Sequence, residues 1–249
     1  MSNSFYALGL TLVLGIFMLV GCILAFVIDK DKSKIMDFIL GLALSVIVML
    51  IGVDLLPEAL EILKVKYLYL FLIFLVLGYI ILRLLDNFIP DHDDNKLARS
   101  EMKDNLIHIG VVSGVALSIH NIIEGMAVYA TGVNDIVTAL FMSLGIGLHN
   151  IPLGMVIAST LYQGNKSRKK TGIIILLLSL STFVGGLVMF MFGSVNETVV
   201  GCLLALTVGM LAFIVIDELF PRIRKSKNKK ESFMGILAGV ILLVVSMFI

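Results

Sequence analysis

The chain has 249 residues, of which 59% are hydrophobic and 15% are charged, and its mean hydropathy is +1.07. A soluble domain could not bury that much apolar surface, so the composition excludes a soluble protein and indicates an integral membrane protein. The net charge of +1 is uninformative as a sum, but the distribution of charge along the chain is informative.

Apolar runs long enough to cross a bilayer, which takes roughly 20 residues per helix, account for most of the sequence. The runs are continuously apolar, whereas the strands of a membrane barrel would alternate polar and apolar residues, so the predicted fold class is all-α. We predict one transmembrane domain, 1–249, with eight helices at about 5–28, 35–60, 66–86, 105–130, 135–162, 171–194, 197–220 and 232–249.

Basic residues are concentrated in alternate connections between these helices. Of the 19 Lys and Arg, all except Lys64 and Lys66 lie in or beside the connections that follow the first, third, fifth and seventh helices. The positive-inside rule places those connections in the cytoplasm, so both termini are predicted to face outward. The run RIRKSKNKK at 222–230 resembles a nucleic-acid or anionic-lipid patch, but topology explains it and we predict no nucleic-acid partner.

Two similar polar motifs interrupt the apolar pattern, SIHNIIEGMAV at 118–128 and GLHNIPLGMVI at 147–157. His120 and Glu124 are four residues apart and share one face of a helix, and His149 stands at a similar depth in the next, antiparallel helix. A charged group near the bilayer centre costs at least ~2.5–3.5 kcal/mol, so these side chains need a partner. Two imidazoles and a carboxylate suit a divalent transition metal, with zinc first and iron, manganese or cadmium as alternatives.

Each of these residues alone would more often be a buried group satisfied by a hydrogen bond, and it is the combination that favours a metal site. The amide oxygens of Asn121 and Asn150 could coordinate the ion, or the amides could link helices through hydrogen bonds.

A second pair of related motifs lies in the second and seventh predicted helices, VDLLPEA at 53–59 and DELFPRI at 217–223. The two helices run in opposite directions, so the same motif would lie at opposite faces of the membrane. This pattern predicts an inverted repeat of three helices, two central helices and three helices. The acidic residues would attract cations to the two mouths of a pathway, Asp54 and Glu58 outside, Asp217 and Glu218 inside.

The four motifs, HNIIEG, HNIPLG, DLLPEA and DELFP, resemble those of the ZIP family of zinc- and iron-type metal transporters, and the similarity to its bacterial members covers nearly the whole chain. The resemblance implies metal uptake toward the cytoplasm through a central site between the fourth and fifth helices, in a bacterial cytoplasmic membrane. By position it implies five metal ligands: His120, Asn121, Glu124, His149 and Asn150.

The chain departs from the family pattern at its centre. Ile123 replaces the usual proline, Leu153 replaces a usual bridging glutamate, and the sixth predicted helix has no acidic residue. Two neighbouring cations need bridging carboxylates to offset their repulsion, so we predict a single central metal.

Three further hypotheses are weighed against transport. An intramembrane metalloenzyme is disfavoured because the HExxH spacing is absent, so we predict no enzymatic activity and no cofactor besides the transported ion. No GxxxxGK[ST] motif is present, so ATP is not the predicted energy source. A metal-binding membrane sensor and a degenerate homologue that no longer transports stay open. Small residues in LVLGYIIL at 75–82 are compatible with a homodimer, and PDHDDNK at 90–96, with His92, offers a metal-binding or merely solvated loop.

Overall fold

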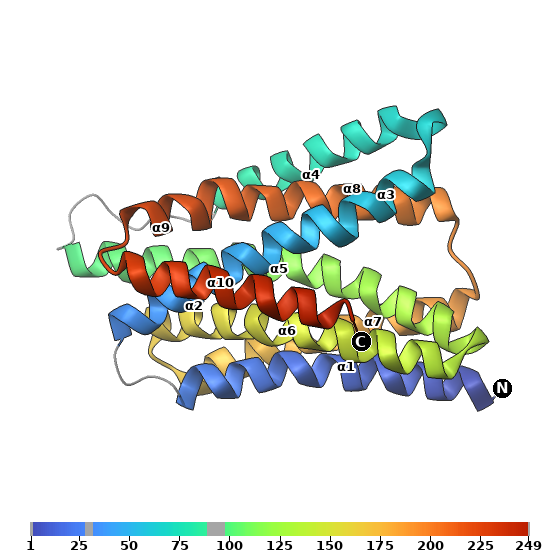
Figure 1. Cartoon of the computed structure of the whole chain (residues 1–249), viewed down its shortest axis with the longest axis horizontal. Helices are drawn as coiled ribbons and strands as arrows, with labels where there is room; N and C mark the ends of the chain where they lie inside the picture. Colours follow the sequence, from blue (N-terminus) through green and yellow to red (C-terminus); the bar gives the residue numbers. More distant parts are fainter. Residues whose placement is uncertain (1, 28–31, 89–97, 249) are drawn as a thin grey trace.

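The computed structural model describes residues 2–27, 32–88 and 98–248, which form helices joined by short connections (Figure 1). The predicted all-α fold class is therefore confirmed. The helices are α1 Ser2–Val27, α2 Lys32–Met49, α3 Leu56–Leu63, α4 Leu68–Phe88, α5 Ala98–Asn134, α6 Ile136–Asn165, α7 Arg168–Phe192, α8 Glu197–Phe213, α9 Phe220–Lys225 and α10 Lys229–Ser246. Two π-helical segments, η1 Leu50–Leu55 and η3 Ile214–Leu219, and one 3-10 turn, η2 Val65–Tyr67, complete the described elements.

Seven of the described helical stretches are long and apolar enough to cross a membrane by length and composition. These are Asn3–Val27, Ser33–Leu63, Val65–Asp86, Gly110–Asn134, Ile136–Gly164, Arg168–Phe192 and Glu197–Lys225. The eighth predicted helix is present as α10, but its first turn carries Lys229, Lys230 and Glu231, so its uncharged part is shorter. The chain is a multi-pass helical membrane protein.

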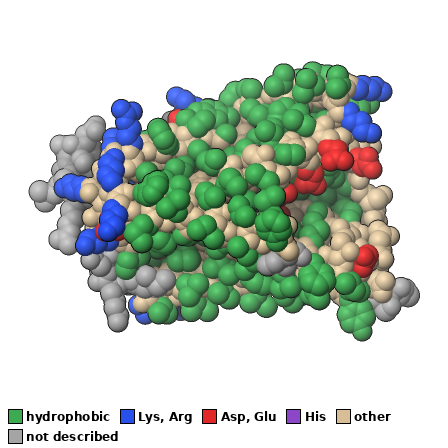
Figure 2. Space-filling model, viewed as in Figure 1, with side chains coloured by type: hydrophobic (Ala, Val, Ile, Leu, Met, Phe, Trp, Pro, Cys, Tyr) green, Lys and Arg blue, Asp and Glu red, His purple; other side chains and the backbone are tan. Residues whose placement is uncertain are grey.

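The surface has the distribution of side chains that a bilayer requires. Apolar side chains cover the middle of the visible face, whereas most of the visible Lys and Arg gather at one end (Figure 2). That end carries α9 with Arg222, Arg224 and Lys225, and we call it the basic end. Polar residues are instead found inside the helix bundle, where His120, Asn121, Glu124, His149 and Asn150 are buried.

The apolar runs predicted plain helices for the second and seventh membrane-spanning stretches. The structure differs, because each stretch contains a π-helical segment. η1 ends two residues before Pro57, and η3 ends two residues before Pro221. Proline lacks an N–H and its ring clashes with the carbonyl group four residues earlier, which a wider turn accommodates. The offset in residue number between η1 and η3 is the same as the offset between Asp54 and Glu218.

The helix pair α1 and α6 packs closely enough to require glycine. A Cβ atom on Gly21 would lie 2.1 Å from the carbonyl oxygen of Ile151, and one on Gly154 would lie 2.4 Å from the carbonyl oxygen of Met18. These distances are far below van der Waals contact, so no larger residue fits without moving a helix. The interface fixes α6 beside α1 close to His149.

The pair α5 and α7 packs in the same way. A Cβ atom on Gly125 would lie 1.8 Å from the carbonyl oxygen of Thr182, and one on Gly185 would lie 1.9 Å from that of Ile122. α2 packs on α10 and α4 packs on α8 through further glycines at backbone contacts: Gly41, Gly235, Gly78 and Gly209. Small residues at such contacts are typical of helix association in membranes.

The start of α6 is set by the side chain of Asp135, which accepts hydrogen bonds from the backbone N–H groups of Val137 and Thr138. Asp135 therefore caps two of the donors that a helix leaves unsatisfied at its N-terminus. The hydroxyl of Thr138 also donates to it, and together these hydrogen bonds lower the pKa of the Asp135 carboxyl. This cap fixes where the helix that carries His149 begins.

Candidate metal centre

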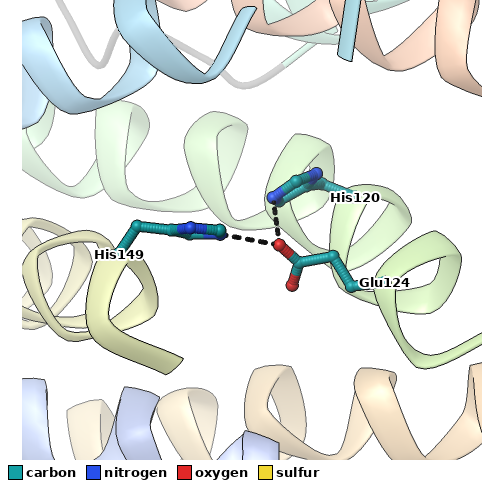
Figure 3. A group of neighbouring side chains, drawn as sticks. All are labelled: His120, Glu124 and His149. Atoms are coloured by element: carbon teal, nitrogen blue, oxygen red, sulfur yellow. Dashed lines mark hydrogen bonds and ion pairs between the residues drawn. The ribbon is translucent and has the colours of Figure 1, made fainter. Parts of the chain in front are cut away.

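Three side chains from α5 and α6 meet inside the bundle (Figure 3). Glu124 Oε1 lies 2.8 Å from His120 Nε2, one turn earlier on α5, and 2.8 Å from His149 Nε2 on α6. One potential ligand atom from each residue lies within 4.8 Å of the other two. The cluster brings together the two imidazoles and the carboxylate that the sequence predicted.

All three residues are buried, with exposed fractions of 1% for His120, 7% for Glu124 and 4% for His149. A carboxylate in a low-dielectric interior is costly unless cations or donors surround it. Glu124 satisfies this condition with His149, which hydrogen-bonds Oε1 at 2.8 Å, and with Asn150, whose Nδ2 donates to Oε2 at 3.1 Å.

Several buried polar atoms of this cluster have no hydrogen-bond partner among the described residues: His120 Nδ1 and Nε2, Asn121 Oδ1 and Asn150 Oδ1. His120 Nε2 is near Glu124 Oε1, but the contact lacks the direction of a hydrogen bond. Buried polar atoms are nearly always paired, so this concentration of unpaired ones requires a reason. Imidazole nitrogens and amide oxygens are all groups that bind transition metals, so the donor set fits a divalent cation.

The two asparagines have their amide nitrogens occupied and their amide oxygens unpaired. Asn121 Nδ2 donates to the carbonyl oxygen of Leu178 at 3.3 Å and contacts the sulfur of Met18 at 3.8 Å, which ties α5 to α7 and α1. Asn150 Nδ2 is held by Glu124, as described above. Both readings of these residues, metal ligand and helix linker, therefore stay compatible with the contacts, and coordination by either stays a prediction.

A cavity of about 220 Å³ lies against the site and is lined by residues of η1, α6 and α10 and by Met247. Asp54 and His149 are both in its wall, together with Gly145 and, from the end of α10, Ser246. Asp54 is exposed, whereas His149 is buried. The predicted role of Asp54 in a pathway remains a prediction.

The other predicted pathway residues are not members of the metal cluster. Glu58 is exposed on α3, and its charge interacts with those of Asp54, Glu61 and His120. Asp217 is exposed on η3 and accepts a hydrogen bond from the hydroxyl of Tyr79 on α4. Glu218 is partly exposed. The loop with His92 lies outside the described residues.

Sequence reasoning missed the contribution of Tyr79 and of the end of α10. Tyr79 follows Gly78, which packs on the backbone of α8, and nothing in the apolar pattern around it marks it as a partner of Asp217. Ser246 and Met247 likewise line the cavity only because α10 packs against α2.

The position of Leu153 agrees with a cluster that has one carboxylate. Leu153 is 1% exposed and lies one turn after His149 on α6. In the part of the chain that the structure describes, the group of His120, Glu124 and His149 contains no second acidic residue.

Comparison with known proteins finds one matching family and several relatives that cover most of the chain. A sequence model of the family described as ZIP Zinc transporter matches residues 90–247. A protein named zinc transporter ZupT from Oceanobacillus iheyensis is 28% identical over 267 residues, covering 100% of this chain and 99% of the relative. Proteins of the same name from Akkermansia muciniphila and Clostridium perfringens are 30% and 25% identical, covering 95% and 100% of this chain and 94% and 97% of the relatives.

Proposed function

Because the chain belongs to the ZIP zinc transporter family, we propose that it carries Zn²⁺ across the bacterial cytoplasmic membrane toward the cytoplasm. Membership of a transporter family means that it is not an enzyme. The observation that carries the proposal is the buried cluster of His120, Glu124 and His149, whose ligand atoms converge within 4.8 Å. The relatives that are named zinc transporters support zinc as the substrate.

The site binds a single ion in this proposal. Glu124 contributes one negative charge, so a bound divalent cation leaves the site with a net charge of about +1 when both histidines are neutral. A second cation would be repelled by the first, and Leu153 offers no carboxylate to offset that repulsion. Water or the amide oxygens of Asn121 and Asn150 complete the coordination.

The proposed architecture is an inverted repeat of α1 to α4 and α7 to α10 around α5 and α6. Its support is the equivalence of η1 with η3, and the reciprocal packing of α1 on α6 and of α7 on α5. The residue-number offset between η1 and η3 also relates Gly21 to Gly185. Gly21 meets the backbone of Ile151, two residues before Leu153, and Gly185 meets that of Ile122, two residues before Glu124. Proteins built this way alternate access around a central site.

In the proposed orientation the basic end is cytoplasmic and both termini are outside, in accordance with the positive-inside rule. Metal enters past Asp54 and Glu58, passes through the cavity to His149, and leaves past Asp217 and Glu218. A homodimer through α4, around residues 75–82, stays a prediction.

The test is uptake into proteoliposomes that contain a metal-sensitive dye, with Zn²⁺, Cd²⁺, Fe²⁺ and Mn²⁺ compared. We expect saturable Zn²⁺ uptake by the wild type, loss of uptake in Glu124→Ala and His149→Ala, and normal uptake in the control Glu197→Ala, because Glu197 is exposed at the start of α8. A folded wild-type protein that binds metal but gives no flux would refute transport and favour the sensor hypothesis.

A further inference from the structure

The two motifs that contain the π-helical segments, at 53–59 and 217–223, differ in charge at two equivalent positions, one of which pairs Val53 with Asp217. The shift in residue number that superposes η1 on η3 takes Asp54 to Glu218 and Pro57 to Pro221, and it takes Glu58 to Arg222. The first motif therefore carries two carboxylates and no cationic group, whereas the second carries two carboxylates, Asp217 and Glu218, together with the guanidinium of Arg222.

The surroundings of Asp54 and Glu58 reinforce the negative charge at that mouth. Both residues are exposed, and the carboxylates whose charges act on Glu58 are those of Asp54 and Glu61. Asp54 also lines the cavity that leads to His149. A cation that arrives at this mouth meets several carboxylates close together.

The surroundings of Asp217 and Glu218 are different, because a cationic side chain acts on Glu218 and a hydroxyl donates to Asp217. Arg222 follows Glu218 by one helical turn, and the charges of the two side chains interact. The Tyr79 hydroxyl donates to Asp217 and is itself hydrogen-bonded with Arg83, one turn later on α4. Arginine stays protonated at any physiological pH, so this compensation is permanent.

We propose that Arg222, assisted by Arg83 acting through Tyr79, weakens divalent-cation binding at the basic-end mouth and so promotes metal release there. The inference rests on the proposed transport function and identifies a structural cause for weak inhibition of uptake by metal on the basic-end side. Arg222 competes with the departing ion for Glu218, and its positive charge repels that ion. Arg222 is thus a positioning residue for Glu218 and takes no part in the central site.

The experiment uses right-side-out bacterial membrane vesicles, in which the proposed cytoplasmic end faces the lumen, and subtracts the uptake of a Glu124→Ala sample. Initial Zn²⁺ uptake is measured while the Zn²⁺ concentration inside the vesicles is raised. A single charge about one helical turn from a divalent ion, in partly hydrated surroundings, changes its affinity by about tenfold. We therefore expect internal Zn²⁺ to inhibit Arg222→Gln at about tenfold lower concentration than wild type, with an unchanged KM for external Zn²⁺.

Controls separate this effect from a general disturbance. Arg224→Gln removes an exposed charge from the same short helix α9 and should behave as wild type. Arg222→Lys should restore the wild-type response because it keeps the charge, and Tyr79→Phe, which removes the hydroxyl that contacts Asp217, should shift inhibition in the same direction as Arg222→Gln.

The outcomes are distinct. Wild-type inhibition by internal Zn²⁺ in a transporting Arg222→Gln protein would overturn the inference and leave the proposed function intact. If Arg222→Gln fails to fold, an unchanged response in Tyr79→Phe overturns it instead. Absence of Zn²⁺ uptake by the wild type would overturn the proposed function and this inference with it.

Discussion

Replacing Glu124 with glutamine tests the metal centre with the smallest change of shape. Glu124 Oε1 is 2.8 Å from both imidazole Nε2 atoms, and Oε2 accepts a hydrogen bond from Asn150. Glutamine has nearly the same volume and keeps one acceptor oxygen, so Glu124→Gln should fold. It removes the negative charge, however, and with it the anionic ligand of the proposed site.

The size of the effect follows from the number of ligands. Four-ligand structural zinc sites bind with about 10–16 kcal/mol, which corresponds to about 2.5–4 kcal/mol per ligand. Loss of one of three protein ligands should therefore weaken Zn²⁺ binding by about two to three orders of magnitude, since about 1.4 kcal/mol corresponds to a factor of ten.

Titration calorimetry of the detergent-solubilised protein with Zn²⁺ measures this change, and Glu197→Gln is the matched control, because it removes a carboxylate at the exposed start of α8. Thermal unfolding in the presence of a chelator checks that Glu124→Gln is folded. A dissociation constant within about threefold of the wild-type value would refute the assignment of Glu124 as a ligand. It would also refute the inference that side chains bind metal because their ligand atoms lie close together.

Three further substitutions test the surroundings of the site. Leu153→Glu should raise the number of Zn²⁺ ions bound from one to two, measured by elemental analysis, and should destabilise the metal-free protein because it buries a second carboxylate near Glu124; a stoichiometry that stays at one would refute the role of Leu153. Asn150→Ala should weaken Zn²⁺ binding by about 10–100-fold in the same calorimetric titration, because it removes the donor that orients Glu124, and unchanged binding would contradict that role. Gly125→Ala should lower the stability by about 1–3 kcal/mol in thermal unfolding, because its Cβ would lie 1.8 Å from a carbonyl oxygen of α7, whereas Gly9→Ala, with nothing within 4 Å, should be neutral; equal stabilities would contradict the packing.

The apolar pattern was sufficient to predict the helices, because in a membrane each span has to satisfy its own backbone hydrogen bonds. A run such as 66–86 has to be helical whatever its neighbours are, and α4 covers it with bounds shifted by about two residues. His120 and Glu124 could also be paired from sequence, because four residues along a helix bring two side chains onto one face.

Features that depend on packing between distant segments could not be predicted in the same way. The hydrogen bond between Tyr79 and Asp217 requires α4 to lie against α8, and the cavity beside His149 requires the end of α10. The π-helical segments were missed for a local reason: proline signals a distorted helix, but several distortions satisfy it, and the residues after Pro57 continue a regular helix.

The rate of release offers a physical reason for a site with few ligands. At a typical association rate constant of about 10⁷ M⁻¹s⁻¹, a carrier that completes about one cycle per second needs a dissociation constant of about 10⁻⁷ M or weaker during release. A four-ligand site worth about 13 kcal/mol would hold its ion for minutes. Three ligands at the same energy per ligand give a binding free energy of about 10 kcal/mol, which is close to the limit set by the dissociation constant above. A modest weakening of binding when access alternates is then enough for release. In the proposed site, leucine at position 153 would keep binding in that range, whereas a second carboxylate would strengthen binding and delay release.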